Sequence, residues 1–151
     1  MLVTVEKHRR LLTLWDGDLP VLTAAIALGR APDGPKRAQG DGRTPEGRYR
    51  ICLVKEQGRY GLSLGLSYPN AADAQTAFAQ GRIDNATLNA VLNAQASGAR
   101  PPWGSPLGGE IYLHEGSTDR DWTQGCIALA PADMAVLWAH RDQIEAVDIR
   151  P

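Results

Sequence analysis

Two residues in the last third of the chain, His114 and Cys126, have the types and the spacing of a base and a nucleophile. His114 ends an apolar run that favours a strand, and Cys126 follows twelve positions later, after a mostly polar loop. A thiol with the ordinary pKa of about 8.5 is mostly protonated at pH 7, and a nearby imidazole can take that proton. A loop of this length can reverse the chain, so the sequence predicts a cysteine nucleophile served by a histidine.

Gly125 stands directly before the cysteine and permits a tight backbone turn there. We expect the amides of residues 125–127 to point toward a substrate carbonyl and to hold the negative oxygen that develops on attack. His114 also needs an acceptor for its second ring nitrogen. The candidates are a backbone carbonyl of the turn at residues 115–118, which we favour, and the carboxylates of Glu115, Asp119 and Asp121.

Each member of the pair also has a purely structural interpretation, His114 as a surface or capping histidine and Cys126 as a buried core cysteine. Their combination, with a glycine before the thiol, favours chemistry. Cys52 lies in a strand-like run and is interpreted as a small buried side chain. No CxxC spacing occurs, and Thr118 stands where a zinc-protease motif would need a second histidine. We therefore expect no metal and no cofactor.

Length and composition favour one domain over residues 1–151. Of the 151 residues, 43% are hydrophobic and 22% are charged, which is ordinary for a globular protein. A formal net charge of −1 argues against a nucleic-acid partner, because binding to phosphates needs a basic surface. Thirteen of the sixteen cationic residues are arginine, a bias that suits carboxylate recognition but is also typical of a GC-rich genome.

No stretch is long and apolar enough for a membrane span, and the first residues lack the pattern of a signal peptide. We expect no membrane partner and a monomer. As given, the sequence predicts a cytoplasmic protein. If it is a trimmed domain, the whole protein is expected in the periplasm.

The pattern of the chain predicts a mainly β fold with short helices, of the α+β class. Two alanine-rich helices are expected to pack on the sheet, the first capped by Asn70 and the second by Asp84 or Asn85. Two glycine- and proline-rich stretches, 29–48 and 98–109, are expected to be loops, the first one wall of a cleft. The expected strands are 2–6, 10–15, 19–28, 49–55, 61–67, 110–114 and 144–149, and the expected helices are 71–80, 84–97 and 131–141.

The site residues resemble the signature of the YkuD-type L,D-transpeptidase catalytic domain family, in particular its YafK-like murein endopeptidase branch. The resemblance spans nearly the whole chain, and its segments occur in the family's order. They are His114-Glu115-Gly116, Asp121-Trp122, Thr123–Leu129, Thr44–Tyr49, Leu62–Leu64 and Ser67–Asp73.

This resemblance implies a β-sandwich or barrel with a narrow cleft that holds Cys126 as nucleophile and His114 as base. The family cleaves the bond between meso-diaminopimelate and D-alanine in peptidoglycan stem peptides, through a thioester. An amine acceptor then gives a 3→3 crosslink, and water gives trimming. Carbapenems are implied as covalent inhibitors.

Three positions depart from the commoner motif. Gln124 replaces a histidine, Ala128 replaces an arginine that recognises a substrate carboxylate, and Glu115 stands where glycine often follows the catalytic histidine. The expected substrate-binding residues, some of them candidates to replace the missing arginine, are Tyr68, Trp122, Arg43, Arg120 and Gln124, with Arg48 as a further candidate. Tyr68 and Trp122 are alternatively core residues.

A leaderless chain favours hydrolysis, because recycled muropeptides in the cytoplasm need only water as acceptor. The first hypothesis is therefore an L,D-carboxypeptidase acting on a stem peptide or muropeptide. The alternatives are a periplasmic crosslinking transpeptidase, a murein endopeptidase and an unrelated cysteine hydrolase. A noncatalytic peptidoglycan-binding module is the alternative of another class, and it predicts a buried, unreactive Cys126.

Overall fold

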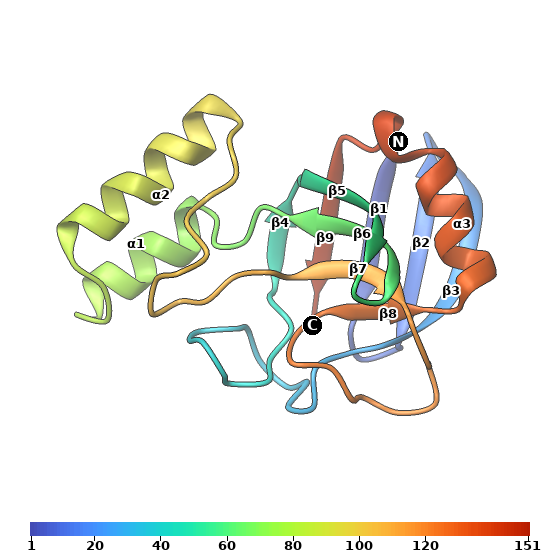
Figure 1. Ribbon diagram of the computed structural model, residues 1–151, viewed down its shortest axis with the longest axis horizontal. Helices are drawn as coiled ribbons and strands as arrows, with labels where there is room; N and C mark the ends of the chain where they lie inside the picture. The colour runs from blue at the N-terminus through green and yellow to red at the C-terminus, as the bar shows by residue number, and fades with distance from the viewer.

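The computed structural model describes residues 1–151 and contains one nine-stranded sheet, three α-helices and a short 3-10 helix (Figure 1). The sheet order is β4-β9-β1-β2-β3-β8-β7-β6-β5. The expected mainly β fold with short helices is confirmed. The strands are β1 (Leu2–Glu6), β2 (Leu11–Asp16), β3 (Leu19–Ala27), β4 (Gly47–Tyr49), β5 (Ile51–Gly58), β6 (Gly61–Leu66), β7 (Tyr112–Glu115), β8 (Ile127–Leu129) and β9 (Ala146–Arg150); the helices are α1 (Ala71–Ala79), α2 (Asn85–Ser97), α3 (Pro131–Ala139) and the 3-10 helix Arg141–Gln143.

The sheet curls until its two edges approach one another. β4 and β5 are the edge strands, yet only Arg50 separates them in the chain. The Arg50 amide donates to Ser67 Oγ at 3.0 Å, and the Ser67 amide donates to the Arg50 carbonyl at 2.9 Å. A single residue between opposite edges, together with the natural twist of strands, forces the sheet into a nearly closed barrel.

The core fills the interior of this barrel. Val3 and Val5 on β1, and Leu12 and Leu14 on β2, are completely buried, because every second side chain of a strand points to the same face. β1, β2 and β3 form an antiparallel meander, and β9 pairs parallel to β1. The same core cluster reaches Leu113 on β7 and residues of β8, so the strands that carry the candidate site rest on a packed interior.

Both alanine-rich helices begin where the sequence predicts. Asn70 caps α1 in a capping box with Asp73, and Asp84 caps α2. The expectation that they pack on the sheet is wrong, because they pack mainly on each other and lie to one side of the barrel (Figure 1). α2 buries only Val91, and such small side chains cannot cover a sheet face. No helix has the length and apolar composition needed to cross a bilayer.

Four features of the chain differ from what the sequence predicts. The expected strand 49–55 is two strands that change edge at Arg50. The expected strand 110–114 begins only at Tyr112, because Glu110 has a φ of 55°, which does not continue a strand. Cys52 is half-buried rather than buried, since β5 is an edge strand. β8 was not expected at all.

The glycine- and proline-rich stretch after β3 is a loop, as expected, and a buried lysine holds it. Lys7 Nζ donates to the carbonyls of Gly34 at 2.9 Å and Thr44 at 2.7 Å, and to the carboxylate of Glu46 at 3.0 Å. The Lys7 side chain is 4% exposed. Burial lowers the pKa of Lys7, while its pairing with Glu46 opposes that change. This ammonium therefore fixes the loop on the barrel.

Replacing Lys7 with methionine keeps most of the aliphatic stem and removes all three donated bonds. We expect the free energy of unfolding to fall by about 2–3 kcal/mol, because the acceptors are left without a partner. Urea denaturation measures this change. Arg9→Met is the matched control, because Arg9 is 63% exposed and pairs only with Glu6, and its loss is expected to stay below about 0.5 kcal/mol. Equal losses in the two variants would contradict the anchoring role.

Candidate active site

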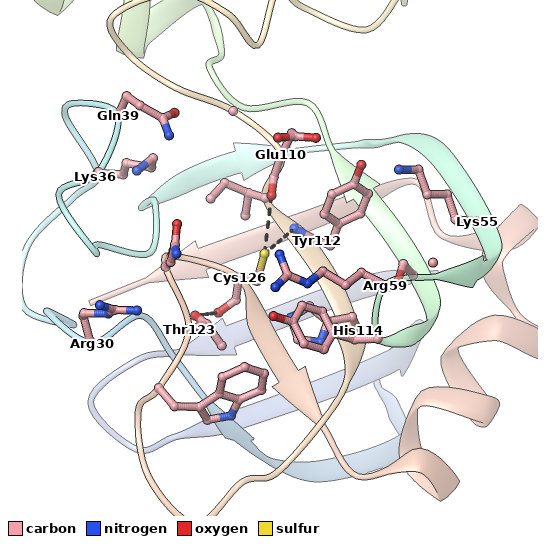
Figure 2. Close-up of a pocket in the computed structure, with 18 residues that line it drawn as sticks. Arg30, Lys36, Gln39, Lys55, Arg59, Glu110, Tyr112, His114, Thr123 and Cys126 are labelled. Atoms are coloured by element: carbon pink, nitrogen blue, oxygen red, sulfur yellow. Dashed lines mark hydrogen bonds between the residues drawn. The ribbon is translucent and has the colours of Figure 1, made fainter.

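The pairing of β7 with β8 brings the histidine and the cysteine to one side of the sheet. The two strands are parallel, with Leu113 opposite Ile127 and His114 opposite Ala128. Tyr112 and His114 share a face because they are two residues apart on β7. Cys126 directly precedes β8, and its Sγ accepts the Tyr112 N–H at 3.3 Å. The predicted pair therefore lines one cavity, in spite of the loop between its members (Figure 2).

Gly125 is required at its position by both conformation and space. Its φ is 138°, and an added Cβ would lie 2.7 Å from the Arg43 carbonyl oxygen and 3.0 Å from Ile111 Cδ1. The Gly125 amide donates to Thr123 Oγ1 at 3.1 Å, so the expectation that this amide holds a substrate oxygen does not fit the geometry. The Cys126 amide has no acceptor in the structure, which leaves it free for that role.

His114 is oriented by the backbone carbonyl of the next residue. Its Nδ1 lies 2.7 Å from the Glu115 carbonyl oxygen, and because a carbonyl only accepts, Nδ1 carries the hydrogen. This carbonyl belongs to the turn at residues 115–118, which we favoured from the sequence as the source of the acceptor. Of the carboxylate alternatives, Glu115 accepts the Leu62 amide and Asp121 pairs with Arg10, and the Asp119 carboxylate makes no hydrogen bond to His114. Nε2 is therefore the nitrogen that can exchange a proton.

Burial keeps both reactive groups neutral. His114 is 2% exposed, and burial lowers its pKa from the ordinary value, while the bond to Glu115 partly opposes this. Burial raises the pKa of the half-buried Cys126 to about 11, and the Tyr112 N–H only partly offsets the rise. The thiol donates to the Glu110 carbonyl at 3.4 Å (Figure 2). The free protein therefore holds a thiol beside a neutral imidazole, not an ion pair.

An aromatic residue that no sequence pattern indicates covers the histidine. Tyr60 stacks on His114 with ring centroids 4.6 Å apart and an interplanar angle of 19°. Trp122 meets His114 edge-on at 5.8 Å, and its Nε1 donates to the Ser117 carbonyl at 2.8 Å. Trp122 thus lies at the site, as expected from the sequence. Tyr60 has no signal of its own, because only the folded β5–β6 hairpin brings it to His114.

The cavity that holds the pair has a volume of about 380 Å³, and basic side chains surround it (Figure 2). Arg30 and Lys36 come from the loop after β3, which forms one wall as expected, and Lys55 and Arg59 come from the β5–β6 hairpin. Lys36 pairs with Asp41 outside the lining, whereas the other three cations have no ion-pair partner. The only acidic residue of the lining is Glu110. The lining is therefore strongly positive.

The substrate-binding residues expected from the sequence are only partly at this cavity. Trp122 and Gln124 line it. Tyr68 does not: it is completely buried, and its hydroxyl donates to the Leu107 carbonyl at 2.7 Å, so it is a core residue. The Arg43 side chain lies beside Gly34, and Arg120 lines a separate hollow beside Trp122, so neither reaches the cavity. The further candidate, Arg48, is also absent from the lining.

The structure also bears on the departure from the family motif at position 128 and on metal binding. Ala128, at the position where the family resemblance implies an arginine, is completely buried on β8 opposite His114, so a long side chain has no room there. The basic residues that do line the cavity come from other elements, and a single sequence does not show which loop tips reach a site. No cluster of three or more His, Cys, Asp or Glu side chains is placed to hold a metal ion, and we assign no metal ligand.

Comparisons with known proteins identify the family. A sequence model of the L,D-transpeptidase catalytic domain, YkuD, matches residues 1–149. The chain therefore belongs to the family of L,D-transpeptidase catalytic domains. The narrower resemblance to the YafK-like branch stays a prediction. No curated protein sequence matches the chain.

Solved structures share the fold at low sequence identity. The helical cell shape determining protein Pgp2 from Campylobacter jejuni superposes with a TM-score of 0.67 at 21% identity, over 99% of this chain and 46% of that one. The L,D-transpeptidase from Xylanimonas cellulosilytica gives 0.54 at 11% identity, over 99% and 59%. An L,D-transpeptidase in complex with imipenem gives 0.52 at 12%, over 99% and 58%. The chain thus spans about half the length of these proteins.

The neutral state of the thiol gives a direct prediction. In a Cys52→Ser background, we expect iodoacetamide to alkylate Cys126 slowly at neutral pH, because a pKa of about 11 leaves roughly one thiol in 10⁴ ionised at pH 7. Intact-protein mass spectrometry follows the rate from about pH 6 to about pH 11, where it should still be rising. A rate that levels off below about pH 8 would contradict a neutral thiol in the free protein.

Proposed function

We propose that this domain is a cysteine acyltransferase that cleaves the bond between meso-diaminopimelate and D-alanine in peptidoglycan stem peptides, with water as its main acceptor. It would then act as an L,D-carboxypeptidase. The observation that carries the proposal is the single cavity in which Cys126 and His114 lie, with His114 Nδ1 committed to the Glu115 carbonyl. Membership of the L,D-transpeptidase family supports the choice of substrate.

The neutral pair implies general-base catalysis rather than a preformed thiolate. As Cys126 Sγ forms a bond to the substrate carbonyl carbon, its proton passes to His114 Nε2. The thiol now donates to the Glu110 carbonyl, so bound substrate has to turn the S–H toward the imidazole. The free amide of Cys126 is available to the carbonyl oxygen as it becomes negative.

The reaction has two halves, the acylation of Cys126 and the hydrolysis of the resulting thioester. Collapse of the tetrahedral intermediate breaks the C–N bond, and His114 Nε2 gives its proton to the nitrogen of the leaving D-alanine, which leaves a thioester on Cys126. A water molecule attacks that thioester and loses a proton to Nε2. The thiolate that leaves takes the proton back, so the shortened peptide departs from an unchanged protein.

The charge of the cavity supports an anionic substrate. Stem peptides carry free carboxylates, and the cations without a partner, Arg30, Lys55 and Arg59, surround the cavity of a chain whose net charge is −1. A positive cleft on a nearly neutral protein attracts anions and positions them. These residues stand in for the arginine that is missing at position 128.

The size of the cavity supports water as the acceptor. A volume of about 380 Å³ lies toward the lower end of the 300–1,000 Å³ that is typical of small-ligand sites. It suffices for the reacting end of one donor peptide, and water needs no second peptide site. With an amine acceptor the same thioester would give a 3→3 crosslink. A noncatalytic peptidoglycan-binding module would keep the fold but would have no use for an oriented base beside a thiol.

The proposal is tested by incubating the protein with a disaccharide tetrapeptide and following the products by mass spectrometry. We expect release of D-alanine and formation of the tripeptide. Cys126→Ala should abolish this reaction, and His114→Gln should slow it by roughly 10²–10⁴-fold, because the general base is lost. Cys52→Ala is the matched control and should keep the activity.

Each other outcome of this assay is decisive. A crosslinked dimer would overturn hydrolysis as the main reaction but keep the thioester. If no muropeptide changes, crosslinked ones included, and a carbapenem such as imipenem leaves Cys126 unmodified, the enzyme proposal is wrong and the noncatalytic module is favoured.

The cationic lining makes a separate prediction. Arg59→Gln should raise the KM for the tetrapeptide by about 5-fold, as expected for a partly exposed charge pair worth about 1 kcal/mol, and should weaken the salt dependence of kcat/KM. Arg48→Gln makes the same change of charge on the exposed face of β4, away from the cavity. Steady-state kinetics at two salt concentrations compare the two variants. Identical kinetics would show that Arg59 does not bind the substrate.

A further inference from the structure

The tip of the β5–β6 hairpin is fixed against the end of β7. Only Arg59 and Tyr60 join the two strands. The Leu62 amide donates to the Glu115 carboxylate at 2.9 Å. Gly61 has a φ of 83°, and a Cβ there would collide with the same carboxylate. The Glu115 carboxylate thus contacts the tip at both Gly61 and Leu62, and it fixes the tip beside His114.

This anchorage lays the Tyr60 ring over the imidazole. The rings of Tyr60 and His114 are nearly parallel at 4.6 Å, and Trp122 meets Tyr60 edge-on at 5.4 Å and His114 edge-on at 5.8 Å. Tyr60 is 41% exposed, whereas His114 beneath it is 2% exposed. The hydroxyl of Tyr60 makes no hydrogen bond within the protein. The ring, rather than the hydroxyl, is what the histidine meets.

We propose that Tyr60 is a positioning residue for His114: its ring covers one face of the imidazole, keeps water off it and holds the ring where Nδ1 donates to Glu115 and Nε2 is left for the thiol. This inference rests on the proposed function, in which His114 is the base. Stacking of this kind favours one ring orientation over others by several-fold.

The charged groups around His114 do not account for its state by themselves. The titratable groups that face it are Arg59 and Tyr60 on the hairpin tip, Lys55 on β5, Glu115 on β7, Glu110, Arg30 and Lys36 around the cavity, and the thiol of Cys126. None of them makes an ion pair with His114. Burial is the main influence that lowers the pKa of His114, and the Glu115 carbonyl opposes it. Tyr60 supplies part of that burial.

Loss of the Tyr60 ring should raise the pKa of His114. Removing the ring admits water to the imidazole, so the pKa of His114 rises toward its ordinary value of about 6.5. At a given pH near that value, less of the histidine is then in its neutral, basic form. The acidic limb of the profile of kcat/KM against pH therefore moves to higher pH, and kcat also falls because the base is less well oriented.

Three variants test the proposal. Tyr60→Ala should raise the pKa of His114 in an NMR titration of the ring, shift the acidic limb of kcat/KM the same way and lower kcat by roughly 10-fold. Tyr60→Phe keeps the ring and should restore most of the lost rate. Phe78→Ala is the matched control, because Phe78 is a similarly exposed aromatic, at 42%, on α1. It should change none of these quantities.

The titration needs no substrate, so its result does not depend on the proposed reaction. The other two histidines of the chain, His8 and His140, do not line the cavity and are internal references in the same spectra. If the wild-type protein turns over no muropeptide but His114 shifts as expected, the proposed function fails and the role of Tyr60 in shielding the imidazole stands. If Tyr60→Ala leaves the His114 titration and the acidic limb unmoved, or if Tyr60→Phe loses as much rate as Tyr60→Ala, the inference is overturned.

Discussion

The parallel pairing of β7 with β8 is the contact on which the candidate site depends. It sets the register in which Cys126 lies beside the amide of Tyr112, two residues before His114 on the same face of the sheet. The pairing is short, and neighbouring contacts hold it. Gly125 fits under the Arg43 carbonyl only because it lacks a side chain, and Thr123 Oγ1 accepts the Gly125 amide and donates to the Cys126 carbonyl. A thiol at the end of so constrained a turn has little freedom to move away from the cavity.

Burial is the second feature that shapes the chemistry. It favours the uncharged form of both groups, so the same environment that places Cys126 and His114 together also prevents them from exchanging a proton before substrate arrives. In the proposed mechanism, such a site is unreactive in the free protein and is activated by the substrate. The positive lining complements this arrangement, because it attracts carboxylates while the nucleophile itself carries no charge.

The sequence sufficed for the features that single residues determine. His114, Cys126 and Gly125 could be selected from their types and order, and the caps Asn70 and Asp84 from their side chains. β8 could not, because three residues carry no periodic signal and it exists only through its neighbours β3 and β7.

Other features depend on long-range packing and were missed for that reason. Tyr60 and Arg59 reach the cavity because the sheet curls and carries the β5–β6 hairpin over β7. From its type alone, Tyr68 could line the cleft or belong to the core, and the segment that holds it turns into the core. A single sequence does not show which side of a barrel an aromatic residue will face. It also does not show which strand end a loop tip will cover.

Acid-quenched mass spectrometry can show whether Cys126 forms a thioester with the donor peptide, the step on which the proposed reaction depends. Protein mixed with a disaccharide tetrapeptide is quenched during turnover, and its proteolytic fragments are sequenced by tandem mass spectrometry. We expect an acyl group equal to the donor minus D-alanine, carried on Cys126, absent from Cys52 and removed by hydroxylamine. Turnover without any adduct on Cys126, or with the adduct on another residue, would contradict it.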